Sequence, residues 1–192
     1  GHCMSLRSRV TEPIRAVFAS ATGPNRRPEL NRRRESSVPG VYVVGDLAGA
    51  PVIKLAMAQG IEVIDEIAKE MPPVTTAAAP PAVGVALGEP RPPLAGDVGL
   101  LDILVVGAGA AGLNAALAAK ERGYRVLVLE KEKLANTIEN FPEGKWVYAE
   151  PDTSPPKGKL WLDGAQKEDL IARWNAIVRE NALDVRTEEP LT

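Results

Sequence analysis

One segment limits the fold of this chain more than any other: DILVVGAGAAGLNAALAAKERGYRVLVLE, at 102–130. An apolar run at 103–106 precedes a glycine-rich turn, then a stretch of small and apolar residues up to Gly123, then a second apolar run at 126–129. Apolar runs without alternation are typical of parallel strands that helices cover. The segment therefore predicts a βαβ unit and an α/β fold with a parallel, Rossmann-like sheet.

The glycine-rich turn matches the pattern GxGxxG between the predicted strand and helix. In such a turn Gly107 permits the sharp bend, Gly109 lets a pyrophosphate approach the backbone, and Gly112 lets the helix pack closely on the strand. The helix N-terminus then offers unpaired N–H groups and a partial positive charge to phosphates. The predicted phosphate-binding residues are Gly107, Ala108, Gly109, Ala110, Ala111 and Gly112.

An acidic residue, Glu130, closes the second predicted strand and is followed by Lys131. In dinucleotide-binding units an acid at this place accepts hydrogen bonds from the adenosine ribose. Strand, turn, helix, strand and acid occur in the expected order, which favours dinucleotide binding. A purely structural glycine turn is the alternative.

The first half of the chain predicts a strand and a helix. The apolar run at 41–44 lies between turn residues, as in a buried strand, and a helix with one apolar face is expected from Pro51. Gly60 interrupts that helix and indicates a close approach to another backbone. The apolar face comprises Ile53, Met57, Ile61, Ile64 and Ala68, and the residues left for water are Lys54, Glu62, Asp65 and Lys69.

Composition excludes several kinds of chemistry. The single histidine and single cysteine both lie in the leading GHCM, which reads like a tag remnant, so no histidine base, cysteine nucleophile, disulfide framework or metal cluster is expected. We predict no catalytic residue and no metal ligand. The net charge of -2 argues against nucleic acid as a partner. The apolar run at 103–119 contains three glycines and Asn114, so it favours strand, turn and helix over a membrane span, and a cytoplasmic protein is expected.

The chain divides into four predicted regions. An irregular leader occupies 1–37, and its arginine-rich part at 26–34 is interpreted as a solvated loop with no assigned function; a phosphate-binding patch is the alternative. A strand–helix segment spans 38–70, a Pro/Ala-rich linker spans 71–100, and the glycine-fingerprint segment spans 101–192. Within the last region 131–164 is expected to be mostly loop, a helix is expected at 166–181, and Val185 is a weak candidate for a further strand.

The stretch SVPGVYVVGDLAGAPVIKLAMAQGIEVIDEIAKE, at 37–70, resembles the C-terminal flavin-binding segment of thioredoxin reductase-like and related pyridine nucleotide-dependent flavoproteins. The resemblance implies that Gly45 and Asp46 lie at the ribityl or pyrophosphate part of FAD. It also implies that the backbone from Ala50 through Pro51, Val52 and Ile53 faces the isoalloxazine ring. A turn or helix-capping role is the alternative for Asp46.

The second half, from Asp102 to about Thr187, resembles the opening segment of the same superfamily. The stretch LEKEKLANTIENFPEGKWVYAEP is most similar to the branch of bacillithiol disulfide reductase-like proteins. The resemblance implies FAD as cofactor, with its pyrophosphate at the glycine turn and its adenosine ribose at Glu130 and Lys131. It implies NAD(P)H as reductant of the parent protein, although this chain has neither a second GxGxxG nor the CxxC of the family. Trp146, Tyr148 and Trp161 are interpreted as packing anchors, with flavin contact as the alternative.

The two segments occur in the reverse of the family's order, and the nicotinamide domain between them is absent. The chain is expected to be either the junction of two tandem modules, which its abrupt end favours, or a circularly permuted FAD domain. In both cases 41–44 and the first βαβ unit should be neighbouring strands around one FAD. The expected function is the FAD-binding portion of an NAD(P)H-dependent flavoprotein oxidoreductase; the alternatives are an NAD(P)-binding domain and a non-catalytic Rossmann-like scaffold. Beyond the cofactor, the expected partners are a second copy in a homodimer or further domains of a larger parent chain.

Overall fold

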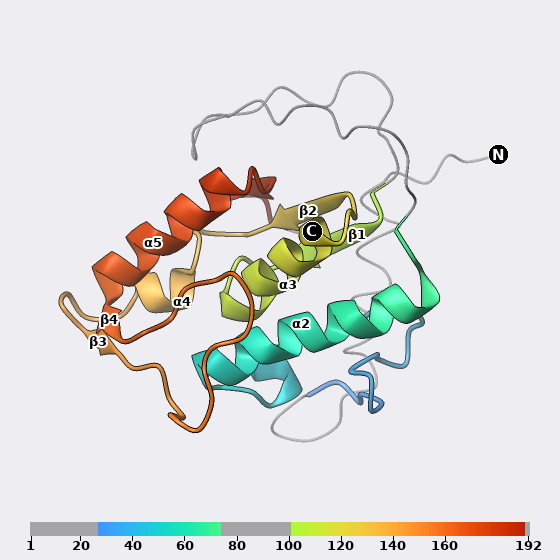
Figure 1. Ribbon diagram of the computed structural model, residues 1–192, viewed down its shortest axis with the longest axis horizontal. Helices are drawn as coiled ribbons and strands as arrows, with labels where there is room; N and C mark the ends of the chain where they lie inside the picture. The colour runs from blue at the N-terminus through green and yellow to red at the C-terminus, as the bar shows by residue number, and fades with distance from the viewer. Residues whose placement is uncertain (1–26, 74–100, 191–192) are drawn as a thin grey trace.

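A computed structural model of the chain describes residues 27–73 and 101–190 (Figure 1). Most of the predicted leader and linker lies outside these ranges. The elements, in chain order, are η1 (Asp46–Ala48), α2 (Ile53–Glu70), β1 (Ile103–Val106), α3 (Ala110–Glu121), β2 (Val126–Leu129), α4 (Asn136–Glu139), β3 (Trp146–Val147), β4 (Ala165–Gln166), α5 (Lys167–Glu180) and β5 (Val185–Arg186).

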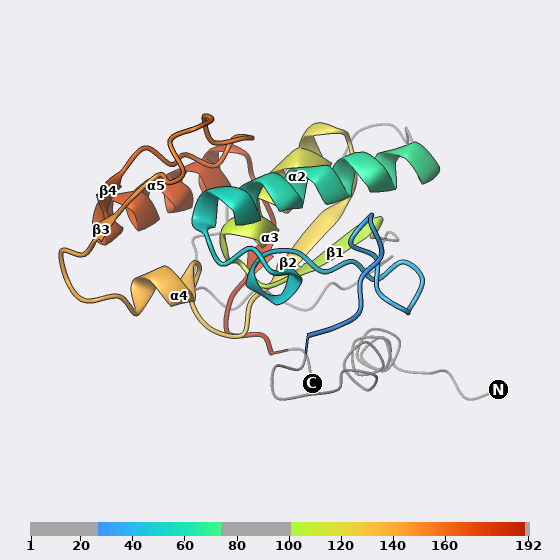
Figure 2. The ribbon, with the colours of Figure 1, turned by 90° about the horizontal axis from the view of Figure 1, so that it is seen from below.

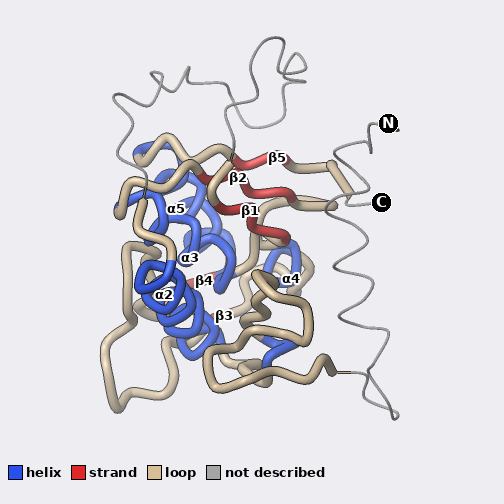
Figure 3. The backbone as a smooth tube through the Cα atoms, turned by 90° about the vertical axis from the view of Figure 1, so that its right-hand side faces the viewer, coloured by secondary structure: helices blue, strands red, loops and turns tan. Residues whose placement is uncertain are grey.

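The main sheet has three parallel strands in the order β1-β2-β5. β1 pairs with β2 along its whole length, from Ile103 opposite Val126 to Val106 opposite Leu129, and β2 pairs with β5 at Val128 and Val185. Figure 3 shows the three strands as neighbours, with α2, α3 and α5 on one side of them. The predicted α/β class, both predicted strands of the βαβ unit and the candidate strand at Val185 are confirmed.

Helix α3 is buried on all sides, because it lies between the sheet and α2. Every residue from Ala111 to Ala119 is buried, and most of these side chains are small. Leu113 and Leu117 share a core with Val128 of β2 and Trp174 of α5. Ala115, Ala118 and Ala119 form a second core with Ile64 of α2. Figures 1 and 2 both show α2 running alongside α3.

Gly60 explains how closely the two helices approach each other. A Cβ atom at Gly60 would lie 2.4 Å from the carbonyl oxygen of Ala111 and 3.0 Å from the amide nitrogen of Ala115. Only a residue without a side chain fits this contact. The predicted close backbone approach at Gly60 is therefore confirmed, and the partner is α3.

The predicted strand at 41–44 is wrong. Tyr42 forms only an isolated antiparallel bridge with Glu35. The backbone bonds of this stretch stay local: Ser36 N donates to Val41 O at 2.8 Å, and Val43 N donates to Arg34 O at 3.0 Å. Because the run is short and bounded by turns, its backbone N–H and C=O groups bond to the turn just before it and not to β1.

The region after β2 contains more structure than the predicted loop. It holds α4 and the short antiparallel pair β3–β4, in which Trp146 lies opposite Gln166. The last predicted helix is confirmed as α5, which buries Leu170, Trp174 and Val178. In the described ranges no helix is both long and apolar enough to span a bilayer.

Candidate functional site

Gly107 bends the turn and Gly112 packs closely, as the sequence predicts, and Gly109 leaves open the surface that a ligand would approach. Gly107 has a φ of +102°, which favours glycine, and its amide donates to Leu129 O at 2.7 Å. A Cβ at Gly112 would lie 2.1 Å from the carbonyl oxygen of Gly107 and 3.1 Å from Cγ1 of Val105, so this glycine does serve close packing. A Cβ at Gly109 would meet no atom within 4 Å, so its surface faces open space.

The N-terminus of α3 has unpaired backbone donors beside this open space. Gly109 is the N-cap residue and supplies no side-chain cap. The amides of Ala110, Ala111 and Gly112 donate to no backbone or side-chain acceptor of the described residues. Free amides and the positive end of the helix dipole favour an anionic ligand here. The turn and its surroundings thus fit the diphosphate of a dinucleotide.

Glu130 lies beneath the glycine turn and is buried. Its Oε2 accepts a hydrogen bond from the Ala108 amide at 2.7 Å, and its Oε1 accepts one from the Glu132 amide at 3.0 Å. The carboxylate therefore holds the turn in place, a role that sequence reasoning missed. Each oxygen can accept a further hydrogen bond, so the ribose contact stays a prediction. Lys131 is exposed, with its ammonium 3.7 Å from the Glu132 carboxylate.

The Gly45–Asp46 turn lies against the first turn of α3. A Cβ at Gly45, which has a φ of +80°, would lie 3.3 Å from Cβ of Ala111, and the Gly45 amide donates to the Gln59 side chain at 2.9 Å. Asp46 begins η1, is exposed, and makes no side-chain hydrogen bond or ion pair with another described residue. Its carboxylate is not used as a cap, so it is free to contact a ligand.

The start of α2 is the third part of the site. Ala50 is buried and packs with Ala56 of α2 and Ala111 of α3. Pro51 and Val52 are exposed and Ile53, the first helical residue, is half-buried. Val52 is the N-cap and gives no side-chain cap, so α2 and α3 both begin without side-chain caps. The structure therefore brings together the predicted residues of both segments without pairing them as strands.

Of the three aromatic residues of the loop region, Trp161 packs against the core as predicted, whereas the prediction of a packing anchor is wrong for Trp146 and Tyr148. Trp146 and Tyr148 are exposed and meet edge to face, with ring centroids 6.5 Å apart. Trp161 is half-buried, and the guanidinium carbon of Arg173 lies 4.0 Å from its ring centroid. Figure 1 shows β3 and β4 beside α4 and α5, at the end of the molecule opposite to β1.

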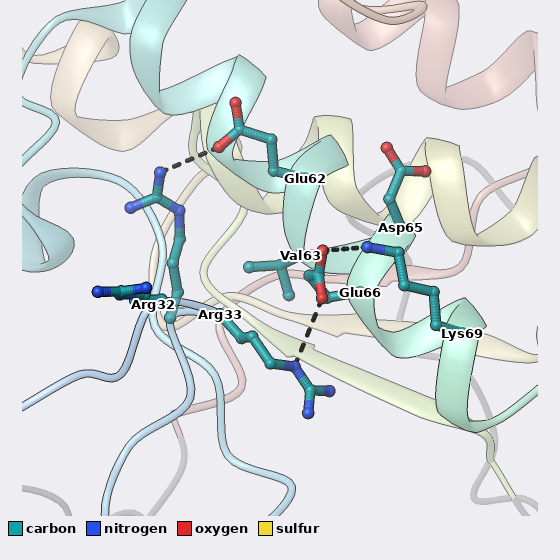
Figure 4. A pocket seen from close by; sticks show the side chains of 8 residues that line it. Arg32, Arg33, Glu62, Val63, Asp65, Glu66 and Lys69 are labelled. Atoms are coloured by element: carbon teal, nitrogen blue, oxygen red, sulfur yellow. Dashed lines mark hydrogen bonds and ion pairs between the residues drawn. The ribbon is translucent and has the colours of Figure 1, made fainter.

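The arginine-rich loop is more ordered than predicted, because part of it pairs with the acidic face of α2 (Figure 4). Arg34 lies 3.0 Å from the Glu62 carboxylate, and Nε of Arg33 lies 3.5 Å from that of Glu66. Arg33 also bonds Glu70, and this hydrogen bond holds the pKa of Glu70 below its ordinary value. The paired charges fasten the loop to α2, so they are not evidence for an anion site.

No three of histidine, cysteine, aspartate and glutamate come together as a metal site within 27–73 and 101–190. The polar groups near the start of α3 are instead its unpaired amides, the buried Glu130 beneath the glycine turn and the adjacent Gly45–Asp46 turn.

Comparisons with known proteins bear on the second half of the chain. Residues 104–154, from β1 to the loop after β3, match the family described as pyridine nucleotide-disulphide oxidoreductase. Among solved structures, the chain is similar to bacillithiol disulfide reductase Bdr (YpdA) from Staphylococcus aureus, with 21% sequence identity and a TM-score of 0.37. That likeness covers 45% of this chain and 28% of the reductase, so it spans less than a third of the reductase's length. No curated protein matches the chain.

The family match confirms the resemblance that the sequence of the second half predicts. It does not include 37–70, so the role of Gly45 and Asp46 stays a prediction.

Proposed function

Since residues 104–154 match the pyridine nucleotide-disulphide oxidoreductase family, we propose that the chain forms the FAD-binding portion of an NAD(P)H-dependent flavoprotein oxidoreductase. One observation carries the proposal. The Gly45–Asp46 turn and the GxGxxG turn, distant in sequence, meet at the first turn of α3, where a Cβ at Gly45 would lie 3.3 Å from Ala111 Cβ. Two segments that each suggest contact with FAD are thus adjacent within one chain.

The proposed roles follow from the geometry of each group. The free amides of α3 and the open surface of Gly109 bind the diphosphate, and Glu130 holds the turn and offers its remaining lone pairs to the ribose. Asp46, whose carboxylate has no described partner, accepts hydrogen bonds from ligand hydroxyls. The uncapped N-terminus of α2 orients toward the flavin ring.

FAD supplies a ring that accepts a hydride and passes electrons onward. The residues of this chain bind and orient the cofactor. The proposal assigns the NAD(P)H site and the electron acceptor to other segments of the parent protein, because this sequence holds one GxGxxG only. The contact between the two segments within one chain also supports a permuted FAD unit over a tandem junction, since a junction would join halves that belong to different sites.

The test is retention of FAD by the purified 192-residue chain. After incubation with FAD and gel filtration, we expect absorption bands near about 375 and 450 nm that co-elute with the protein. Asp46→Asn should weaken retention, and the exposed Lys133→Gln is a matched surface control that should not. A colourless protein that takes up no FAD would contradict the proposal and favour the scaffold. Binding of NADPH or NADH without FAD would favour an NAD(P)-binding domain.

A further inference from the structure

Lys54, in the first turn of α2, is the one described lysine that is buried. Its exposure is 6%, although the helical pattern predicts that it faces water, so that prediction is wrong. Its ammonium donates to the carbonyl oxygens of Pro151 at 2.5 Å and Ser154 at 2.8 Å. No carboxylate of the described residues forms an ion pair with it. The buried charge is therefore solvated by two carbonyl dipoles and has no counter-ion.

A buried ammonium without a counter-ion is costly, and its position increases the cost. Removing a charge from water is unfavourable unless it is paired. The N-terminus of a helix also carries partial positive charge, which repels a cation. A residue present only to fasten the neighbouring loop would do so at lower cost with a neutral donor.

The loop between β3 and β4, which accepts these hydrogen bonds, is also held in place by a neutral side chain. Asn114 of α3 is fully buried, and its amide donates to Met57 O at 2.9 Å and to Lys157 O at 2.8 Å. Its Oδ1 accepts from the Leu160 amide at 3.3 Å. Asn114 therefore holds the loop at 157–160 against both helices without any charge. Fastening alone does not explain why a cation is buried at 54.

The ammonium lies near the start of α2, because Lys54 is the second residue of that helix and its acceptors belong to the loop after β3. Side chains of helical residues lean toward the helix N-terminus, and Figure 1 shows the loop after β3 passing beside that end of α2. An ammonium has three donors, and the two carbonyls use two of them. The third donor has no acceptor and the net charge no counter-ion among the described residues, so a group bound where α2 begins could use both.

We propose that Lys54 is a positioning residue that acts as a fixed internal cation and stabilises negative charge on the flavin ring bound at the N-terminus of α2. This inference rests on the proposed FAD site and deepens it. It predicts that the bound ring is more electron-accepting than free flavin, because negative charge that develops on its N1–C2 carbonyl region has a nearby counter-ion.

Sulfite tests this charge directly, without any turnover. The sulfur lone pair of sulfite forms a bond to flavin N5, and the displaced electron pair becomes negative charge at N1 and the C2 carbonyl, which bleaches the 450 nm band (about 450 nm for oxidised flavin). The sulfite dissociation constant of the FAD-loaded chain is measured for the wild type, Lys54→Gln and Lys54→Arg. Glutamine keeps two N–H donors for the loop carbonyls but removes the charge, whereas arginine keeps the charge.

We expect Lys54→Gln to weaken sulfite binding by about tenfold or more and Lys54→Arg to stay within roughly threefold of the wild type, as one lost charge interaction in a partly desolvated site predicts. The control is Asn114→Ala, which loosens the loop without changing charge and should leave sulfite affinity near the wild-type value.

Two results would overturn the inference while FAD binding stands: equal sulfite affinity in wild type and Lys54→Gln, or equal weakening in Lys54→Gln and Asn114→Ala, which would make Lys54 a loop fastener only. If Lys54→Gln does not fold, Lys54→Met, which also removes the charge and keeps a long side chain, takes its place in both comparisons. A wild-type chain that binds no FAD would instead defeat the proposed function, and this inference with it.

Discussion

Gly109 and Gly112 belong to one motif, yet a methyl group would meet opposite surroundings at the two positions. At Gly109 it would project into open space, and at Gly112 it would lie 2.1 Å from the Gly107 carbonyl oxygen. Gly109 also has an ordinary φ of -82°, so an alanine there is not strained. Gly112 is therefore needed for packing, whereas the proposed function alone requires a glycine at 109, and substitution separates the two requirements.

Gly109→Ala should fold normally and bind FAD poorly. Its midpoint of thermal unfolding without FAD should match the wild type, because the added methyl contacts no protein atom. Its FAD dissociation constant should rise by about tenfold or more, since the methyl blocks the backbone approach of the diphosphate. Titration of FAD followed by protein fluorescence measures this. Unchanged affinity would remove the glycine turn from the site.

Gly112→Ala should behave in the opposite way. The methyl must displace the backbone at Gly107 or move α3 away from β1, which typically costs about 1–3 kcal/mol of unfolding free energy. Urea unfolding of the ligand-free chain measures this loss, with Gly109→Ala as the matched control. Equal stability of the two variants would show that the packing at Gly112 is looser than the structure indicates.

At the scale of elements, the contact between α2 and α3 depends on Gly60. Alanine favours a helix interior by about 1 kcal/mol over glycine, so propensity alone predicts that Gly60→Ala stabilises α2. The structure predicts the reverse, because the Cβ would lie 2.4 Å from a backbone oxygen of α3. We expect a net loss of about 1–2 kcal/mol by urea unfolding. A gain in stability would mean that the two helices do not pack as described.

The starts of β1 and β2 are joined by an ion pair that makes stability depend on pH. Asp102 accepts from the Arg125 amide at 2.8 Å and from its guanidinium at 2.8 and 3.1 Å. The side-chain hydrogen bond from Arg125 holds the pKa of Asp102 below its ordinary value. Unfolding returns that pKa to about 3.9. The pair therefore stabilises the fold fully above about pH 4, and this contribution is lost as pH falls through the lower folded pKa.

Asp102→Asn should accordingly lower the unfolding temperature at pH 7 by a few degrees. The difference from the wild type should shrink as pH falls below about 4, where protonation of Asp102 in the wild type removes the same interaction. Thermal unfolding at a series of pH values between these limits measures it. A difference that stays constant over the series would assign the loss to packing and not to the carboxylate charge.

At the scale of the whole molecule, the proposed site joins segments from both halves of the chain. FAD should therefore protect the amides of both 45–50 and 107–112 from hydrogen exchange, and it should raise the unfolding free energy by about 2.7 kcal/mol at a hundredfold excess over its dissociation constant. Exchange measured by mass spectrometry with and without FAD tests this. Protection confined to 107–112 would favour a nucleotide that contacts the glycine turn alone.

An element could be predicted where the residues that determine it lie within one continuous stretch of the sequence. β1, α3, β2 and α5 follow from local patterns, because each contains enough apolar residues at one spacing to define its buried surface. The run at 41–44 has a similar composition, but its backbone pairs with Arg34 and Ser36 in place of the sheet. Short apolar runs carry no signal for which partner completes their hydrogen bonds, so this strand could not be excluded from sequence.

In the candidate site, too, some features follow from the local sequence and others depend on distant segments. The turn conformation at Gly107 and the packing at Gly112 were predictable, since each follows from the fit of a glycine within a few residues of itself. The hydrogen bond that the Ala108 amide donates to Glu130 could not be predicted, because it depends on the register of two parallel strands.

The sequence by itself determined the βαβ unit, the glycine turn and the close approach at Gly60, because these depend on spacing, chirality and side-chain volume along a continuous stretch. Only the tertiary structure decided that the Gly45–Asp46 turn lies at the first turn of α3 and that Lys54 is buried. Those outcomes depend on which distant backbone groups reach the same place. A helical pattern assigns Lys54 to water, and only the carbonyls of Pro151 and Ser154, brought there by the fold, supply the acceptors that allow its charge to be buried.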